Sequence, residues 1–311
     1  MTPYPLWTFV PLVPLAFLPL AAAAATWLVL QLSALLAGLV VLGRVVLARP
    51  RRDLPVLLAV AADAQPLWIV AGGGNISGLV SAALAGSVAA TLTGRAALGG
   101  ALLALTLLKP QSFAIVALAL LVGLPAARRT AFVGAGLAVA VLLAGASFAL
   151  DPGWIAGWWR SATVLQSTEF SNATGWTLGR LVSAGPAATI TSVAAVLGTI
   201  AILIRWAWTA RPALPWLIAA AVPVSIFSSP HGWSYDQVAL LVSAGVVLGG
   251  APDRGPARVW HLVAIALVFD ALPWLLYAVA LARADEKLSA ITPLAALAVV
   301  LWAWRRRKSS A

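Results

Sequence analysis

The sequence predicts an all-α polytopic transmembrane protein, and three observations lead to this fold class. Hydrophobic residues make up 62% of the 311 residues and charged residues only 9%, whereas a soluble domain carries roughly 25% charged residues. Apolar runs of helix-spanning length follow one another, separated by charged or Gly- and Pro-rich turns. Most Trp residues lie near the ends of these runs, where an indole prefers the membrane interface. Lipid is the solvent in which such an apolar outer surface is stable.

We predict about eleven transmembrane helices within a helical domain of residues 20–304. Some runs are shorter than a perpendicular span needs, so we expect their ends to extend into the flanking turns. The runs are 20–43, 54–71, 76–92, 96–108, 112–127, 131–150, 186–206, 213–229, 237–250, 259–281 and 288–304.

The basic residues fall unequally on the two sides of the predicted membrane. Of the 20 Lys and Arg residues, 15 lie in one set of alternate loops and 5 in the other. By the positive-inside rule the richer side is cytoplasmic, which predicts an outside N-terminus and an inside basic tail, 305–311. The abundance of Ala and Arg is typical of GC-rich bacterial coding. We therefore expect a multi-pass protein of the bacterial cytoplasmic (inner) membrane.

Two segments depart from the pattern of spans. Residues 1–19 are apolar but contain five prolines, which disfavour a continuous helix, so we predict an outer segment that lies along the membrane. The connection 151–185 is the long outer loop. It begins with Trp154, Ile155 and Trp158 at helical spacing, which predicts a short helix in the interface plane.

Several functional classes are excluded by composition. Cysteine is absent, which excludes disulfides and Cys-ligated metal. The net charge of +11 comes from short clusters between apolar runs, so we expect membrane lipids and no nucleic acid as partners. With His231 and His261 as the two histidines and no carboxylates at ligand spacing, no metal site is expected. The glycine run at 72–74 lacks the P-loop pattern, which argues against a nucleotide site.

The few ionisable residues near the spans are candidates for function, because a charge at the bilayer centre costs about 2.5–3.5 kcal/mol. Lys109, followed by Pro110 and Gln111, interrupts an apolar run. It is either a plain outer turn or a cation that binds phosphate. Asp63 and Asp270 lie inside predicted spans, where structural and functional roles stay equally open.

The densest polar cluster runs from Ser228 to Asp236 and lies at the predicted outer surface. It brings His231, Trp233, Tyr235 and Asp236 together, and His231 can bind phosphate when charged or relay a proton. Other polar residues are expected on the same side, either in a cavity or as solvated loop charges: Asn75, Asp151, Glu169 and Arg180.

Four segments together resemble a known enzyme family. They are Tyr4-Pro5 with Pro14 and Pro19, similar to a Tyr-Pro-Pro segment before an early span; Gly74-Asn75-Ile76, similar to a Gly-x-x-Asn turn; Leu107-Leu108-Lys109-Pro110-Gln111, similar to a Lys-Pro-Gln element; and Ser229 to Asp236, similar to Ser-Pro-His-x-Trp-x-Tyr-Asp. The family is glycosyltransferase family 87, the polyprenyl-phosphate-sugar-dependent mannosyltransferases of GT-C architecture.

The resemblance implies an inverting membrane hexosyltransferase that works on the outer face. The donor would be a polyprenyl-phosphate sugar, with mannose expected, and the acceptor a lipid-linked glycan or glycolipid; no cofactor is implied. Cations near the donor phosphate would stabilise the charge of the leaving group, and a carboxylate would take the acceptor proton. The implied roles are catalytic for Asp236 and His231, phosphate-binding for Lys109, His231 and Arg180, and cavity-lining for Asn75, Gln111, Tyr235 and Glu169.

The sequence departs from the family at its start. Enzymes of this family carry a general-base Asp in a first outer loop, and neither that Asp nor the span before it is present. We expect an N-terminally truncated chain; the alternatives are that Asp236, Asp151 or Glu169 serves as the base, or that the chain is a non-catalytic homologue in a glycan-assembly complex. The competing class is a transporter or lipid flippase, against which we find no inverted repeat and no matching pair of interrupted helices.

Overall fold

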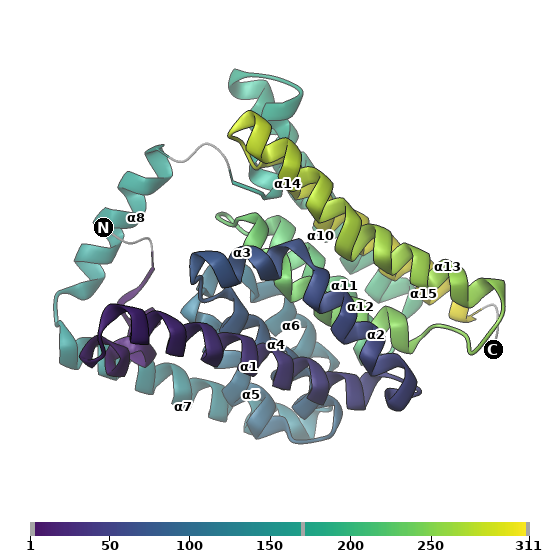
Figure 1. Cartoon of the computed structure of the whole chain (residues 1–311), viewed down its shortest axis with the longest axis horizontal. Coiled ribbons are helices and arrows are strands. Elements are labelled where there is room, and N and C mark those ends of the chain that lie inside the picture. Colours follow the sequence, from purple (N-terminus) through teal and green to yellow (C-terminus); the bar gives the residue numbers. More distant parts are fainter. Residues whose placement is uncertain (1–3, 169–171, 309–311) are drawn as a thin grey trace.

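The computed structural model describes residues 4–168 and 172–308, and all regular structure in these residues is helical (Figure 1). The α-helices are α1 (Leu20–Val46), α2 (Pro50–Asp63), α3 (Gln65–Gly73), α4 (Ser77–Leu92), α5 (Ala96–Ala104), α6 (Ala114–Gly123), α7 (Ala126–Leu150), α8 (Trp154–Thr168), α9 (Gly175–Leu178), α10 (Gly185–Ala210), α11 (Leu214–Ser228), α12 (Leu240–Gly249), α13 (Pro256–Ala266), α14 (Leu272–Arg283) and α15 (Ile291–Lys308). The short 3-10 helices are η1 (Leu6–Thr8), η2 (Val10–Phe17), η3 (Leu105–Leu108), η4 (Pro110–Ser112), η5 (Gly179–Leu181), η6 (Ser234–Ala239) and η8 (Lys287–Ala290), and η7 (Leu267–Ala271) is a π-turn.

The helices are those of a polytopic membrane protein, as the sequence predicts. Within the described residues, 5 helices are long and apolar enough to cross a membrane, and the bent pair of α2 and α3 raises the number to 6. The shorter apolar helices are Ser77–Leu92, Ala96–Leu108, Ala114–Gly123, Leu214–Ser228 and Ser234–Gly249. Each predicted run thus coincides with an apolar helix or the bent pair. The count of eleven spans and the orientation stay predictions, because the shorter helices fall below spanning length.

Three helices form the buried centre of the molecule. In α11 every residue from Ile218 to Phe227 is buried, α12 is buried from Leu240 to Leu248, and most of α4 is buried as well. These helices are apolar all round, which is the pattern of a core helix. The outer helix α7 is also apolar beyond its first turn, yet Leu142 is 71% exposed and only Phe132 and Ser147 of this helix are buried. An apolar outer surface of this kind is solvated by lipid.

Two apolar segments are irregular: α2 and α3 meet at a bend of 56°, and the π-turn η7 separates α13 from α14. Pro66 stands in the first turn of α3, and Pro273 follows η7. A proline inside a helix lacks the N–H donor and displaces a carbonyl of the preceding turn, so both breaks could have been predicted. Asp63 is the last residue of α2 and Asp270 belongs to η7, so both predicted intramembrane carboxyls lie at these breaks.

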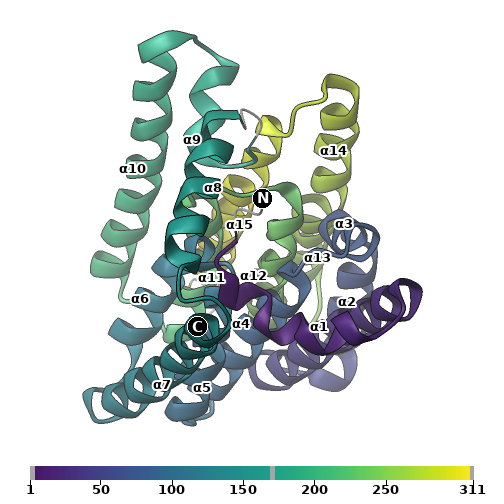
Figure 2. The same cartoon turned by 90° about the vertical axis from the view of Figure 1, so that its left-hand side faces the viewer.

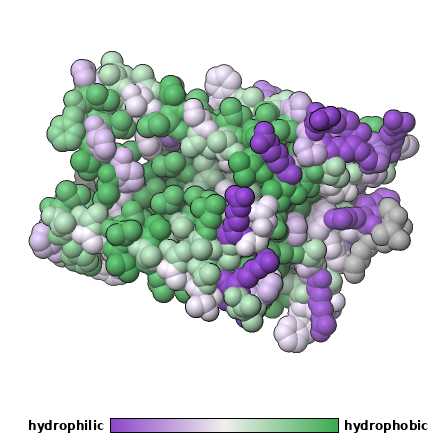
Figure 3. All heavy atoms as spheres, turned by 90° about the horizontal axis from the view of Figure 1, so that it is seen from below, coloured by the Kyte–Doolittle hydropathy of each residue, from purple (hydrophilic) through white to green (hydrophobic). Residues whose placement is uncertain are grey.

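Arginines gather at one end of the helices, which we call the basic end. They lie in the last turns of α1, α10 and α15, in the first turns of α2, α7 and α13, or in the turns beside these helices and between α4 and α5: Arg44, Arg49, Arg51, Arg52, Arg95, Arg128, Arg129, Arg205, Arg211, Arg254, Arg258, Arg305, Arg306 and Arg307. Figure 3 shows hydrophilic side chains towards one end of an otherwise largely hydrophobic face. At this end Arg258 pairs with Asp53 over 2.7 Å.

The first residues and the connection 151–185 have helical structure of their own. Residues 6–17 form 3-10 helices rather than an α-helix, in keeping with their prolines. α8 begins at Trp154, where the Trp spacing predicts a helix, and Figures 1 and 2 show it at the side of the molecule. The Trp7 ring packs edge-on against Trp154 at 5.0 Å. That these segments lie along the membrane surface stays a prediction.

Candidate active site

Lys109 is buried at the opposite end of α5 from Arg95. α5 gives way to η3, and Pro110 starts a second 3-10 turn, so the chain reverses at Lys109 instead of continuing as an α-helix. The Lys109 side chain turns inward and the residue is only 1% exposed. A buried ammonium group is strongly unfavourable unless it is paired and hydrogen-bonded.

The partner of Lys109 is Asp236, from the polar cluster between α11 and α12. Lys109 Nζ donates to Asp236 Oδ1 at 2.5 Å and to Ser77 Oγ at 2.9 Å. The Ser77 hydroxyl lies 2.6 Å from the same carboxylate oxygen and 2.7 Å from Asn75 Oδ1. The three residues come from the end of η3, the start of α4 and η6, so the tertiary fold alone brings them together.

The second oxygen of Asp236 holds the loop in shape. Asp236 Oδ2 accepts the backbone N–H of Trp233 at 3.1 Å, which caps the first turn of η6. The next N–H, that of Ser234, donates to Glu286 Oε2 at 2.9 Å. η6 therefore begins between two carboxylates, one of which also neutralises Lys109.

Two tyrosines enclose the ammonium group. Lys109 Nζ lies 4.5 Å from the centre of the Tyr235 ring and 5.4 Å from that of Tyr4, both within cation–π distance. The two phenols therefore lie around the same ammonium group. Each phenol brings an O–H donor to the site, in a setting where few water molecules compete for it.

Glu286 is a second carboxylate at this site. Burial acts to raise the pKa of the neighbouring Asp285 carboxyl, but hydrogen bonds from Lys287 outweigh burial and hold that pKa below its usual range. Lys287 Nζ pairs with Asp285 at 2.6 Å. Because Lys287 is engaged in this way, it does not neutralise Glu286.

The other predicted site residues lie around this cluster or away from it. His231 Nε2 accepts the indole N–H of Trp233 at 3.2 Å, and a nitrogen that accepts carries no proton. A cationic His231, as implied by the family, would have to release Trp233. Gln111 is half-buried on η4, and Arg180 is exposed on η5; within the described part of the chain neither contacts Lys109 or Asp236. Glu169 lies outside the described residues.

Sequence reasoning overlooked three residues of the cluster. Ser77 could have been found from the Asn75-Ile76-Ser77 sequence, which favours a turn in which the Asn75 side chain accepts the Ser77 N–H; this distance is 3.0 Å. Tyr4 belongs to a motif segment but was assigned no role. Glu286 had no signal, because it lies 52 residues from Ser234 and only folding brings them together.

The fold and this site define a helical membrane protein that encloses a cation, a carboxylate and two phenols at the end opposite the basic end. Residues 2–230 match the family model of glycosyltransferase family 87, and the chain belongs to this family of membrane glycosyltransferases. The match contains Tyr4, Asn75, Ser77 and Lys109 and ends before Asp236. No curated protein and no solved structure gives a significant match.

Proposed function

We propose that the protein transfers a hexose, with mannose the first candidate, from a polyprenyl-phosphate sugar to a hydroxyl of a lipid-linked glycan or glycolipid. The observation that carries this proposal is the buried pair of Lys109 and Asp236 in a chain of glycosyltransferase family 87. An ammonium group is a compact partner for a phosphate, and a lipid phosphate is the leaving group of such a donor. The outer face of the bacterial cytoplasmic membrane is the proposed place of transfer, from the distribution of arginines.

In this proposal the ion pair is the resting state of the site. The donor phosphate takes the place of Asp236 Oδ1 as the partner of Lys109 Nζ, and the Tyr4 and Tyr235 hydroxyls donate to its remaining oxygens. The carboxylate oxygen released in this exchange then faces the acceptor. Asp236 Oδ2 can keep its bond to the Trp233 N–H throughout, so the loop need not unfold.

The chemical step is a single displacement at the anomeric carbon. The bond from this carbon to the phosphate oxygen breaks, its electron pair leaves with the polyprenyl phosphate, and Lys109 stabilises the added charge. A bond from the anomeric carbon to the acceptor oxygen forms on the opposite face, which inverts the configuration. The acceptor proton passes to Asp236 Oδ1, a general-base role.

The proposal is tested by transfer from radiolabelled polyprenyl-phosphate mannose, and from other polyprenyl-phosphate hexoses, in membranes that contain the protein. Lys109→Ala and Asp236→Asn are each expected to lower the rate at least about a hundred-fold, the lower range for removing general-base or charge stabilisation. Glu286→Gln is the matched control, because Glu286 supports η6 without touching Lys109.

Two outcomes would overturn these assignments. Full transfer by both Lys109→Ala and Asp236→Asn would remove the pair from the mechanism. Loss of transfer in Glu286→Gln with retention in Asp236→Asn would give the proton-accepting role to Glu286. A flux of polyprenyl phosphate across proteoliposomes, without any glycosyl product from any donor, would support the flippase instead.

A further inference from the structure

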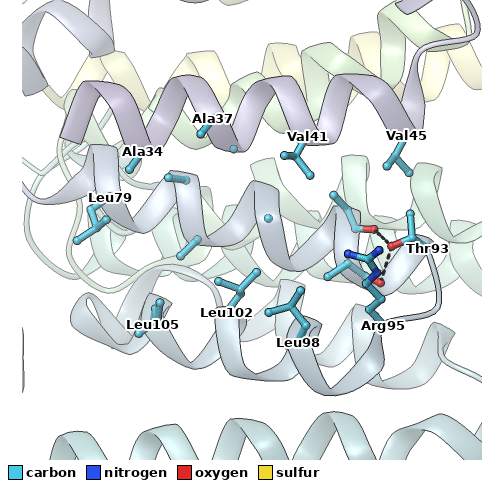
Figure 4. Close-up of a pocket in the computed structure, with 16 residues that line it drawn as sticks. Ala34, Ala37, Val41, Val45, Leu79, Thr93, Arg95, Leu98, Leu102 and Leu105 are labelled. Carbon is cyan, nitrogen blue, oxygen red and sulfur yellow. Dashed lines mark hydrogen bonds between the residues drawn. The ribbon is translucent and has the colours of Figure 1, made fainter. Parts of the chain in front are cut away.

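An apolar groove runs along the outside of the molecule from near the site towards the basic end. It has a volume of about 580 Å³ and lies between α1 and α5, with α4 recessed between them (Figure 4). The floor of the groove consists of small residues of α4: Ala82, Ala83, Gly86, Ala89 and Ala90. Larger side chains such as Val41 and Leu98 form the two walls.

The groove is long enough to cover one leaflet of a bilayer. It extends along α4 from Leu79 to Thr93, which at 1.5 Å per residue is about 20 Å. The hydrocarbon core of a membrane is about 30 Å thick, so a leaflet contributes about 15 Å. A single extended lipid chain therefore fits along the groove without leaving the membrane.

The charge at the groove is found at the basic end. Arg95 is the charged residue among those that line it, and Figure 4 shows it beside Thr93 at one end, with Leu79 and Leu105 at the other. The guanidinium of Arg128 lies against Gly94: a Cβ there would be 3.0 Å from Arg128 Nη1, so glycine leaves room for it. Within the described residues, neither Arg95 nor Arg128 is paired with a carboxylate.

We propose that this groove binds one chain of an anionic phospholipid whose phosphate lies between Arg95 and Arg128. The groove supplies apolar surface for the chain, and the two guanidinium groups complement a phosphate, which arginine binds well. The position of the headgroup phosphate distinguishes this lipid from the proposed sugar donor. The donor's phosphate belongs at Lys109, at the other end of α5, whereas a lipid bound here has its headgroup at the basic end.

The test measures lipid retention by the purified full chain. The protein in detergent is mixed with equal amounts of dioleoyl phosphatidylglycerol and dioleoyl phosphatidylcholine, and the retained lipids are counted by native mass spectrometry. We expect the phosphatidylglycerol preference to fall about five-fold in Arg95→Ala and again in Arg128→Ala, the factor for one basic side chain at an anionic surface. Arg205→Ala, an exposed arginine of the basic end on α10, should leave the preference unchanged.

A second pair of variants tests the groove itself without disturbing the core. Ala37 is exposed on α1 and lines the groove, so Ala37→Phe should fill it and abolish retention of the bound lipid. Leu36→Phe, at the neighbouring exposed position outside the groove, should retain the lipid like the wild type. Both variants add an aromatic ring to the same helix, so a general effect on folding would appear in both.

Three results would overturn the proposal. The first is an unchanged lipid preference in both arginine variants, and the second is equal retention in Ala37→Phe and wild type. The third comes from a parallel arm with undecaprenyl phosphate as the probe. If Ala37→Phe abolishes retention of undecaprenyl phosphate and Arg95→Ala leaves it unchanged, the groove binds a prenyl chain whose phosphate does not lie at Arg95.

Discussion

Arg95 precedes α5 and Lys109 follows η3, so these two cations flank one helical segment, and their surroundings are opposite. Lys109 is 1% exposed, paired with Asp236 and covered by two tyrosine rings. Arg95 is exposed at the end of an apolar groove and, among the described residues, has no carboxylate beside it. The charge of Lys109 is thus neutralised by a residue of the protein, whereas the guanidinium of Arg95 can bind a ligand from the membrane or the solvent.

Removing the buried cation is the most severe way to break this comparison. Lys109→Ala leaves the Asp236 carboxylate buried without its partner, so we expect a loss of about 3–5 kcal/mol in the free energy of unfolding. The measurement is thermal unfolding of the purified protein in detergent. The double variant Lys109→Met with Asp236→Asn should recover part of this loss, because it removes both charges and keeps an oxygen acceptor for the Trp233 N–H, while transfer stays absent. Equal stability of Lys109→Ala and wild type would show that the pair does not hold the fold.

A glycine pair tests how tightly the groove wall α5 is fixed to α7. A Cβ at Gly100 would overlap the backbone carbonyl of Phe132, whereas Gly134 has open space around it. We expect Gly100→Ala to destabilise the protein by about 1–3 kcal/mol through overpacking. Gly134→Ala should instead stabilise α7 by about 0.5–1 kcal/mol, because alanine has the higher helix propensity. A common sign for the two changes would contradict the close contact.

Removing one hydroxyl sharpens the description of the site. Tyr235→Phe removes the phenol hydroxyl and its hydrogen-bonding capacity but keeps the ring against the Lys109 ammonium. We expect a loss of about 0.5–1.5 kcal/mol in unfolding free energy, the usual net worth of one hydrogen bond. Tyr235→Leu, which removes the ring as well, should cost more. If both variants unfold at the same temperature, the ring contributes nothing to holding the ammonium group.

The smallest expected effect belongs to the exposed cation. Arg95→Ala should leave the unfolding temperature in detergent unchanged, because Arg95 is exposed and unpaired among the described residues. The same variant should lose stability relative to wild type once phosphatidylglycerol is added, since a lipid that binds the folded state stabilises it. An identical response of both proteins to this lipid would separate Arg95 from the groove.

Much of the fold follows from local pattern, since each apolar run that the sequence shows became a helix or the bent pair. The breaks at Pro66 and Pro273 could also be predicted from these prolines, although the hydropathy pattern continues through both breaks. Four residues that the sequence singled out, Asn75, Lys109, Tyr235 and Asp236, lie in one cluster, and their roles stay predictions.

Their connections could not be predicted from one sequence. Lys109 and Asp236 are 127 residues apart, and Ser77 and Asp236 are 159 apart. Which oxygen of Asp236 meets which donor depends on how η6 packs against α4, and no local periodicity encodes that packing. Glu286 likewise reaches the site only through tertiary packing, because its own sequence is that of an ordinary charged turn.

The two oxygens of Asp236 accept hydrogen bonds from different groups, and this has a consequence for hydrogen exchange. Oδ2 holds the Trp233 amide, and Oδ1 holds Lys109, so one carboxylate joins the backbone of the loop to the charge of the site. The exchange rate of that single amide proton then reports how firmly Asp236 is seated. A bound phosphate that draws Lys109 away would be visible there as a change in protection, on a protein that has not yet turned over any sugar.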